Sequence, residues 1–291
     1  MRTSRELKDR IASTKNIQHI TTAMKMVAAA RLKKAQARLE SARPYARKMA
    51  EVTLDLAALT AWSFNPLLRR HHFHLRDLII VFTGDRGLSG DFHHEIADQA
   101  IEFGAKLSAK SKVSYYLIGL KGQRRFFEKQ VPVFKSFVGP VAGVSFGMAR
   151  NLSKEIIQWY TEEKFDRIYL FYSKFYSALS QKSRPFQLLP IDPAQARFKE
   201  ESGLFIFEPA RKKLLDSILP RYLESEIFRA FLETEAGELG ARMAAMSAAS
   251  DNAAEIIEEY QLEFNRIRQT QITNEIAEIV GGAEVLNKES R

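Results

Sequence analysis

The stretch 23-AMKMVAAARLKKAQAR-38 decides the fold, because it is rich in strong helix formers and contains neither glycine nor proline. From Ala28 onward, small or apolar residues follow one another in alternating steps of four and three residues. They stand at positions 28, 32, 35, 39, 42, 46 and 49. This spacing is typical of a coiled-coil seam. The stretch therefore predicts a long helix that packs along a second helix.

The pattern extends in both directions from this stretch. Upstream, the same steps of four and three predict that the seam continues through Ile17, Ile20, Met24 and Val27. Downstream, no glycine occurs before about residue 59, and the periodicity resumes beyond Pro44, so that this proline predicts a kink rather than an end. Residues 1–60 are therefore predicted to form an N-terminal coiled-coil helix.

A second helical pattern begins near Pro209 and runs almost to the end of the chain, with Pro220 as a kink or as its true first turn. Ten positions keep the spacing of four and three: Leu239, Met243, Met246, Ser250, Ala253, Ile257, Tyr260, Phe264, Ile267 and Gln271. Gly237 and Gly240 interrupt the helix formers and predict a bend or the close approach of another backbone. Residues 209–291 are predicted to be the C-terminal coiled-coil helix.

Residues 61–208 have a different pattern, in which short β-rich runs alternate with helical segments. The β-rich runs are 77–83, 113–118, 133–138, 167–172 and 186–190. The helical segments are 92–108, 123–129 and 145–162, and residues 60–76 and 192–208 are expected to be connectors. This alternation predicts an α/β domain with a mainly parallel, Rossmann-like sheet, inserted between the two arms of an antiparallel coiled coil.

The positive charge of the chain is concentrated at its start. The formal net charge is +9, and residues 1–50 contain thirteen Lys and Arg against three acidic residues. The remaining 241 residues therefore carry a net charge of −1. An imbalance of this size favours an acidic partner, which could be a phosphate backbone, an anionic lipid or an acidic protein surface. Arg31, Lys33 and Lys34 form the centre of this basic face.

The sequence offers little sign of a self-contained active site. The loop 84-GDRGLSGD-91 follows a strand and precedes a helix, but its glycine spacing fits neither a dinucleotide-binding loop nor a P-loop, and a tight structural turn is favoured. The histidines of 71-HHFH-74 and 93-HH-94 lack a recognisable ligand spacing and are interpreted as solvated loop residues. With no cysteine, thiol chemistry and disulfides are excluded. We expect no catalytic residue, cofactor or metal.

Neither a membrane span nor a secretory signal is expected. The longest stretch without a charge is 136–149, which is shorter than the roughly 20 apolar residues of a span and contains three glycines and a proline. The charged N-terminal residues lead into no apolar segment.

Three segments now identify a family. The opening 11-IASTKNIQHITTAMKMVAAARLKKAQ-36, the turn 85-DRGLSG-90 and the closing 242-RMAAMSAASDNAAEIIEEYQLEFNRIRQTQITNEIAEIVGGAEVL-286 closely resemble the γ subunit of F-type ATP synthases. The resemblance covers essentially the whole chain and is strongest at the two ends. The cysteine-bearing insertion of chloroplast members is absent, so that the likeness is to a bacterial γ subunit.

The resemblance implies a rotor that has no catalytic activity of its own. In this family the coiled coil lies inside a ring of α and β subunits, and the α/β domain contacts the ε subunit and the membrane c-ring at the cytoplasmic face of the plasma membrane. ATP is made or hydrolysed on the β subunits. The family's β-contacting, rotation-coupling positions correspond here to Met24, Lys25, Arg242, Arg268, Gln269 and Thr273.

Two other classes of function remain as alternatives. A basic coiled coil that binds nucleic acid would use the same charges, but base-stacking aromatic residues are expected among them, and residues 1–44 contain no aromatic ring except His19. A nucleotide-dependent α/β enzyme would need the loop chemistry that residues 84–91 lack.

Chain geometry gives one further expectation. If the two helices leave the middle domain near residues 60 and 209 with equal rise, residue 1 lies level with about residue 268. The C-terminal helix then extends beyond its partner by roughly 17 residues at this rise. This tip is apolar at Ile272, Ile276, Ile279, Val280, Val285 and Leu286. An uncovered apolar stripe usually marks a partner surface, and the hypothesis is that the tip is the bearing of the shaft.

Overall fold

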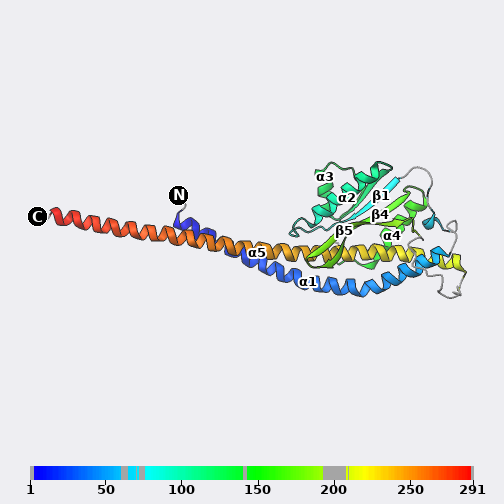
Figure 1. Ribbon diagram of the computed structural model, residues 1–291, viewed down its shortest axis with the longest axis horizontal. Helices are drawn as coiled ribbons and strands as arrows, with labels where there is room; N and C mark the ends of the chain where they lie inside the picture. Colours follow the sequence, from blue (N-terminus) through cyan, green and yellow to red (C-terminus); the bar gives the residue numbers. More distant parts are fainter. Residues whose placement is uncertain are drawn as a thin grey trace. The chain divides into compact units, whose positions relative to one another are not determined.

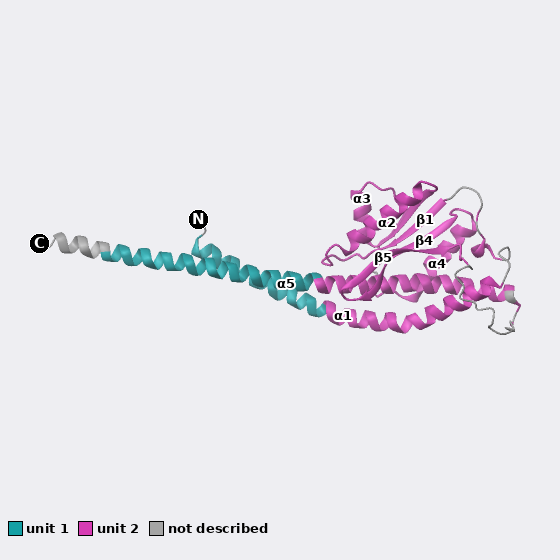
Figure 2. Ribbon diagram, viewed as in Figure 1, with its two compact units in different colours: residues 1–27, 245–291 teal, residues 28–244 magenta. Residues whose placement is uncertain are grey.

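The computed structural model describes residues 3–59, 65–69, 71, 76–139, 143–192, 208 and 210–289, of which 211 and 281–289 are described by their backbone alone. The chain divides into two compact units, which Figure 2 distinguishes by colour. Unit 1 comprises residues 1–27 and 245–291, and unit 2 comprises residues 28–244. Both unit boundaries lie inside helices. The division at residues 60/61 and 208/209 stays a prediction.

Two long helices run through both units (Figure 1). Helix α1 spans Ser4–Ala58 and continues through Pro44. Helix α5 spans Arg211–Glu289 and contains Pro220 well inside it, so that Pro220 does not begin the helix. In unit 2 the predicted seam of α1 is buried at Ala28, Leu32, Ala35, Leu39 and Ala46. This part of the coiled-coil prediction is confirmed.

Of the four predicted seam positions upstream of Ala28, three are wrong, whereas the fourth, Met24, is half-buried. In unit 1, Ile17, Ile20 and Val27 are 51 to 59% exposed, whereas Leu7 and Thr21 are buried. The steps of four and three that lead back from Ala28 pass through Lys25, Thr21, Gln18, Thr14 and Ile11, whose side chains are buried or half-buried. The inner positions of α1 in unit 1 are therefore mostly polar, and Ile17, Ile20 and Val27 face outward.

Unit 2 contains a five-stranded sheet with the order β3-β2-β1-β4-β5. Strands β1 (Arg76–Phe82), β2 (Lys112–Ile118), β3 (Lys135–Phe137) and β4 (Arg167–Ser177) are parallel, and β5 (Ser180–Leu189) is antiparallel to β4. The mainly parallel α/β fold is confirmed. Strands β4 and β5 are longer than predicted, because Ser173 and Lys174 interrupt the apolar run of β4 and β5 begins with the polar residues 180–184.

Helices cover both faces of the sheet. Alternate β1 residues point to opposite sides, so that Ile79 and Val81 pack against α2 (Phe92–Ser108) and α3 (Leu120–Glu128). The opposite face packs against α4 (Phe146–Thr161), the start of α5 and the end of α1. The short helix η2 (Pro66–Leu68) adds two buried leucines to this core, although the sequence predicted a plain connector there. Most of the second predicted connector, 193–207, lies outside the described residues.

No helix among the described residues combines the length and the hydropathy that crossing a bilayer requires.

Candidate functional site

The loop 84–91 is a structural turn that is held by its neighbours. The backbone N–H of Gly84 donates to Nδ1 of His93 (3.2 Å), and the N–H of Leu120 donates to the Asp85 carboxylate (2.8 Å). Leu88 (φ 65°) and Gly90 (φ 57°) both adopt the left-handed conformation that reverses the chain. These contacts tie the loop to α2 and α3, in agreement with the predicted structural turn.

The interpretation of the histidines as solvated loop residues is wrong for His93 and His71. His93 is the second residue of α2 and is buried, and this burial lowers its pKa to about 4. Since Nδ1 accepts from Gly84, Nε2 carries the proton of the neutral ring and donates to the carbonyl of Arg86 at 3.2 Å. His71 lies 3.2 Å from Asp166 and stacks on Tyr160. Both rings support the fold.

Helix α5 approaches this loop closely. Arg242 donates from Nε and Nη2 to the carbonyl of Gly87, both at 3.2 Å, and forms an ion pair with Glu238 one turn earlier. A Cβ on Gly240 would lie 2.9 Å from the carbonyl oxygen of Ala178, in the β4–β5 turn, and a Cβ on Gly237 would lie 3.0 Å from the ring of Phe92. The two glycines therefore permit the close approach that the sequence predicted.

The basic face lies on α1 in unit 2. Arg31, Lys33 and Lys34 are all exposed. Arg38, one turn further along, forms an ion pair with Glu235 of α5 at 3.1 Å and donates to the carbonyl of Val144 at 2.8 Å. The side chains of Arg31 and Lys34 line a cavity together with residues of α5 and of the loop 84–91, whereas Lys33 does not. The structure thus separates one member of the basic face from the other two.

The predicted coupling residues fall into two groups. In unit 1, Met24 and Lys25 are half-buried, and Lys25 donates to the hydroxyl of Ser247 at 2.9 Å. Arg268, Gln269 and Thr273 are exposed, and the Thr273 hydroxyl donates to the backbone carbonyl of Gln269. In unit 2, Arg242 is anchored to the loop as described above. Their role in coupling stays a prediction, because these contacts lie within the chain.

The helix register is close to the expected one. In unit 1, Thr22 lies 2.9 Å from Ser250, and Lys25 pairs with Ser247, so that the numbers of both pairs total 272 instead of the expected 269. Residue 3 is thus level with about residue 269, and α5 extends beyond it (Figure 2). On this extension Ile272, Ile276, Ile279 and Val280 are 43 to 71% exposed. Val285 and Leu286 lie outside the residues with described side chains.

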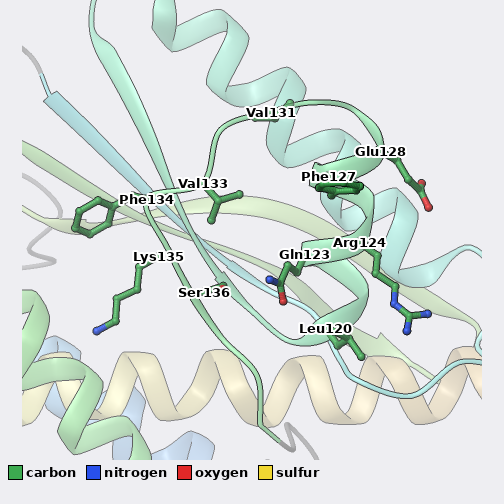
Figure 3. Close-up of a pocket in the computed structure, with 10 residues that line it drawn as sticks. All are labelled: Leu120, Gln123, Arg124, Phe127, Glu128, Val131, Val133, Phe134, Lys135 and Ser136. Carbon is green, nitrogen blue, oxygen red and sulfur yellow. The ribbon is translucent and has the colours of Figure 1, made fainter.

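A groove with a volume of about 720 Å³ lies between α3 and the strand β3 (Figure 3). Its lining is largely apolar, and Phe127 at its rim is 85% exposed. The labelled side chains come from α3, from the segment that leads into β3 and from β3 itself: Leu120, Gln123, Arg124, Phe127, Glu128, Val131, Val133, Phe134, Lys135 and Ser136. The sequence gives no sign of this groove, because its two sides meet only when β3 joins the sheet edge.

No group of three or more His, Asp or Glu side chains within the described part of the chain is arranged to hold a metal ion.

Comparisons with known proteins agree with the resemblance of the sequence. The family model described as ATP synthase matches residues 3–286. A relative from Halothermothrix orenii named "ATP synthase gamma chain" is 39% identical, and the match covers 98% of this chain and all of the relative. A relative of the same name from Heliobacterium modesticaldum is 41% identical over 97% of this chain and 98% of its own.

Solved structures show the same fold. A chain of the Euglena gracilis mitochondrial ATP synthase, described with its F1 part and c-ring, has a TM-score of 0.69 at 18% identity and covers 99% of this chain and 96% of its own length. A chain from the central stalk and c-ring of the Tetrahymena thermophila enzyme has a TM-score of 0.58 at 24% identity, over 79% of this chain and 99% of its own. On the family match and these relatives, the chain belongs to the ATP synthase gamma chains, the non-catalytic rotor-shaft subunits of that enzyme.

Proposed function

We propose that this chain couples rotation of a membrane c-ring to ATP synthesis or hydrolysis on surrounding β subunits, with unit 1 as the part that turns inside the α and β ring. One observation carries the proposal: unit 1 exposes apolar side chains on both of its helices. They are Ile17, Ile20, Met26 and Val27 on α1 and Leu262, Ile272, Ile276, Ile279 and Val280 on α5. Apolar surface of this extent usually faces a protein partner.

The coupling contacts are proposed to be of two kinds. Met24, Lys25, Arg268, Gln269 and Thr273 lie on unit 1, where they could follow successive β subunits as the shaft turns. Arg242 is held against the loop 84–91 by its bonds to Gly87, so a force on this arginine would be passed to the α/β domain.

The proposed partners are the α and β subunits, the ε subunit and the c-ring, and the proposed location is the cytoplasmic face of the bacterial plasma membrane, with peripheral attachment. The basic face would lie opposite acidic loops of the β subunits, which complements its charge. Nucleic-acid binding and nucleotide-dependent catalysis are not needed to explain any described feature.

Reconstitution tests this function directly. The purified chain is mixed with α and β subunits, and the mixture is examined for a complex of defined stoichiometry with ATPase activity. We expect a single copy of the chain per ring, with activity that depends on its presence. An active ring whose activity and composition do not change when the chain is added would contradict the proposal.

A further inference from the structure

A second cavity, of about 360 Å³, lies in unit 2 where α1, α5 and the loop 84–91 meet. Its lining carries five cationic side chains and two carboxylates, and is therefore positive by three charges. The cations are Arg31, Lys34, Arg38, Arg86 and Arg242, and the carboxylates are Glu235 and Glu238. None of the described residues that line the cavity is aromatic.

Both carboxylates already have partners. The Glu235 carboxylate accepts hydrogen bonds from the Arg38 guanidinium at 3.1 Å and from the backbone N–H of Gly143 at 3.0 Å. Glu238 forms the ion pair with Arg242. The side chains of the two glutamates are only 10% and 6% exposed, so their charges are held within the wall of the cavity. These pairs fix the wall and neutralise two of the five cations.

Three cations remain without such a partner. The side chains of Arg31, Lys34 and Arg86 form no hydrogen bond or ion pair with any described residue. Arg31 and Lys34 are three residues apart on α1 and share one side of that helix. Arg86 comes from the loop, and its backbone position is fixed by the bond from His93. Glu235 and Glu238 offset part of this charge, and the net positive charge that remains on the lining favours an anion.

We propose that in the free chain this cavity binds a small anion of the phosphate class, with Arg31, Lys34 and Arg86 as its ligands, and that the acidic β-subunit loops of the proposed function compete with this anion for Arg31 and Lys34 in the assembled ring. Guanidinium groups match the geometry of phosphate oxygens, and an ammonium group adds a compact charge. The volume suits a small ligand rather than a folded segment of a partner. The described part of the lining offers no aromatic side chain on which a nucleotide base could stack. The ligand is therefore recognised by its phosphoryl groups alone.

Calorimetric titration of the full-length chain with pyrophosphate at low ionic strength tests this assignment. Lys34→Gln removes a charge that lines the cavity, and Lys33→Gln removes the neighbouring exposed charge that does not. We expect Lys34→Gln to weaken binding by roughly tenfold and Lys33→Gln by less than about twofold, since screened charges outside the cavity contribute little. Circular dichroism checks that both variants keep their helix content.

Two further titrations separate the possible ligands. Tripolyphosphate and ATP should bind with affinities equal to within about threefold, because only phosphoryl groups are recognised. Much tighter binding of ATP would overturn the assignment to phosphoryl groups alone. So would the absence of pyrophosphate binding, an equal loss in both lysine variants, or binding of a hexaglutamate peptide without binding of pyrophosphate. None of these results depends on assembly with α and β subunits, so the proposed function is tested separately.

Discussion

The two units differ in where α1 and α5 place their apolar side chains. In unit 2 the apolar seam of α1 is buried, and every residue of α5 from 230 to 240 is buried. In unit 1 the inner positions of α1 are mostly polar and joined by hydrogen bonds such as that between Thr22 and Ser250, while Ile17, Ile20 and Val27 face outward. The difference teaches that one pair of helices can serve two purposes. Unit 2 is held together by its own core, and we propose that unit 1 uses its exposed apolar side chains to contact other proteins.

The largest expected difference between the two units comes from truncating a buried side chain of α5 in unit 2. Leu232 is 1% exposed in the core of unit 2, and Leu232→Ala should lower the free energy of unfolding by about 3 kcal/mol. Ile276→Ala truncates an exposed side chain of unit 1 and should leave the free energy of unfolding nearly unchanged. Denaturant unfolding of the isolated chain measures both. An equal loss in the two variants would contradict the assignment of separate roles to the units.

The second effect concerns the buried histidine that supports the loop 84–91. The pKa of His93 is lowered to about 4, so the unfolded chain takes up a proton near pH 6.5 while the folded chain does not. Stability should therefore fall as the pH drops from about 7 to 4, by at most about 3 kcal/mol. Burial raises the pKa of Glu226 to about 7. This shift stabilises the folded chain at low pH, and the stabilisation is lost as the pH rises through 7.

Because these two contributions oppose each other, the effect of His93 must be measured as a difference. Unfolding of the wild type and of His93→Gln is followed at pH 7.5 and pH 4.5. The variant should lose less stability on acidification than the wild type, while the contribution of Glu226 is common to both. Identical pH profiles would show that the histidine is not held neutral by burial.

The close approach of α5 to the β4–β5 turn should produce a smaller effect. In Gly240→Ala, the new Cβ would meet the backbone oxygen of Ala178, and this clash should outweigh the gain in helix propensity. We expect a loss of about 1–2 kcal/mol. Gly147→Ala in α4 meets no atom closer than 3.5 Å and should be neutral or slightly stabilising. Thermal unfolding of both variants sharpens the contrast between a packed and an open helical glycine.

Substitutions in the basic face should have the smallest effect on the free chain, and they are therefore tested by association with the ring. Reversing Arg31, Lys33 and Lys34 together to Glu should weaken association with the α and β ring at low salt, and the difference from wild type should shrink at high salt. A matched control reverses three exposed lysines elsewhere in unit 2, namely Lys110, Lys112 and Lys129. Affinity is measured from the binding of each variant to the immobilised ring. Equal affinities of the basic-face variant and wild type at low salt would exclude an acidic partner surface there.

Particular residues show how far the sequence could be interpreted. The four-three spacing predicted the buried seam from Ala28 onward, since small residues there have no role but packing. It failed at Ile17 and Ile20, because periodicity cannot distinguish a buried seam from an apolar stripe that stays exposed on the chain. The strands predicted for the β4–β5 hairpin were too short, because polar residues near its turn interrupt the apolar runs by which strands are predicted.

The residues of the cationic cavity could be predicted only in part, because the sequence does not show which distant residues the fold brings together. The sequence marked Arg31 and Lys34 as basic, but it could not place Arg86 beside them, since that contact depends on how the loop 84–91 folds against α5. His93 was misassigned because adjacent histidines give no sign of which ring is buried. Arg242 was named from the family resemblance, and the structure adds its bonds to Gly87.

We propose that the end of α5 serves partners rather than the fold of the chain, and deletion of residues 272–291 separates these two roles. The melting temperature of the isolated chain should change by less than about 2 °C, because the removed apolar side chains Ile272, Ile276, Ile279 and Val280 are exposed. The complex with α and β subunits should become less stable and should sustain less torque in single-molecule rotation. A large fall in the melting temperature of the isolated chain, with unchanged torque in the complex, would contradict the account.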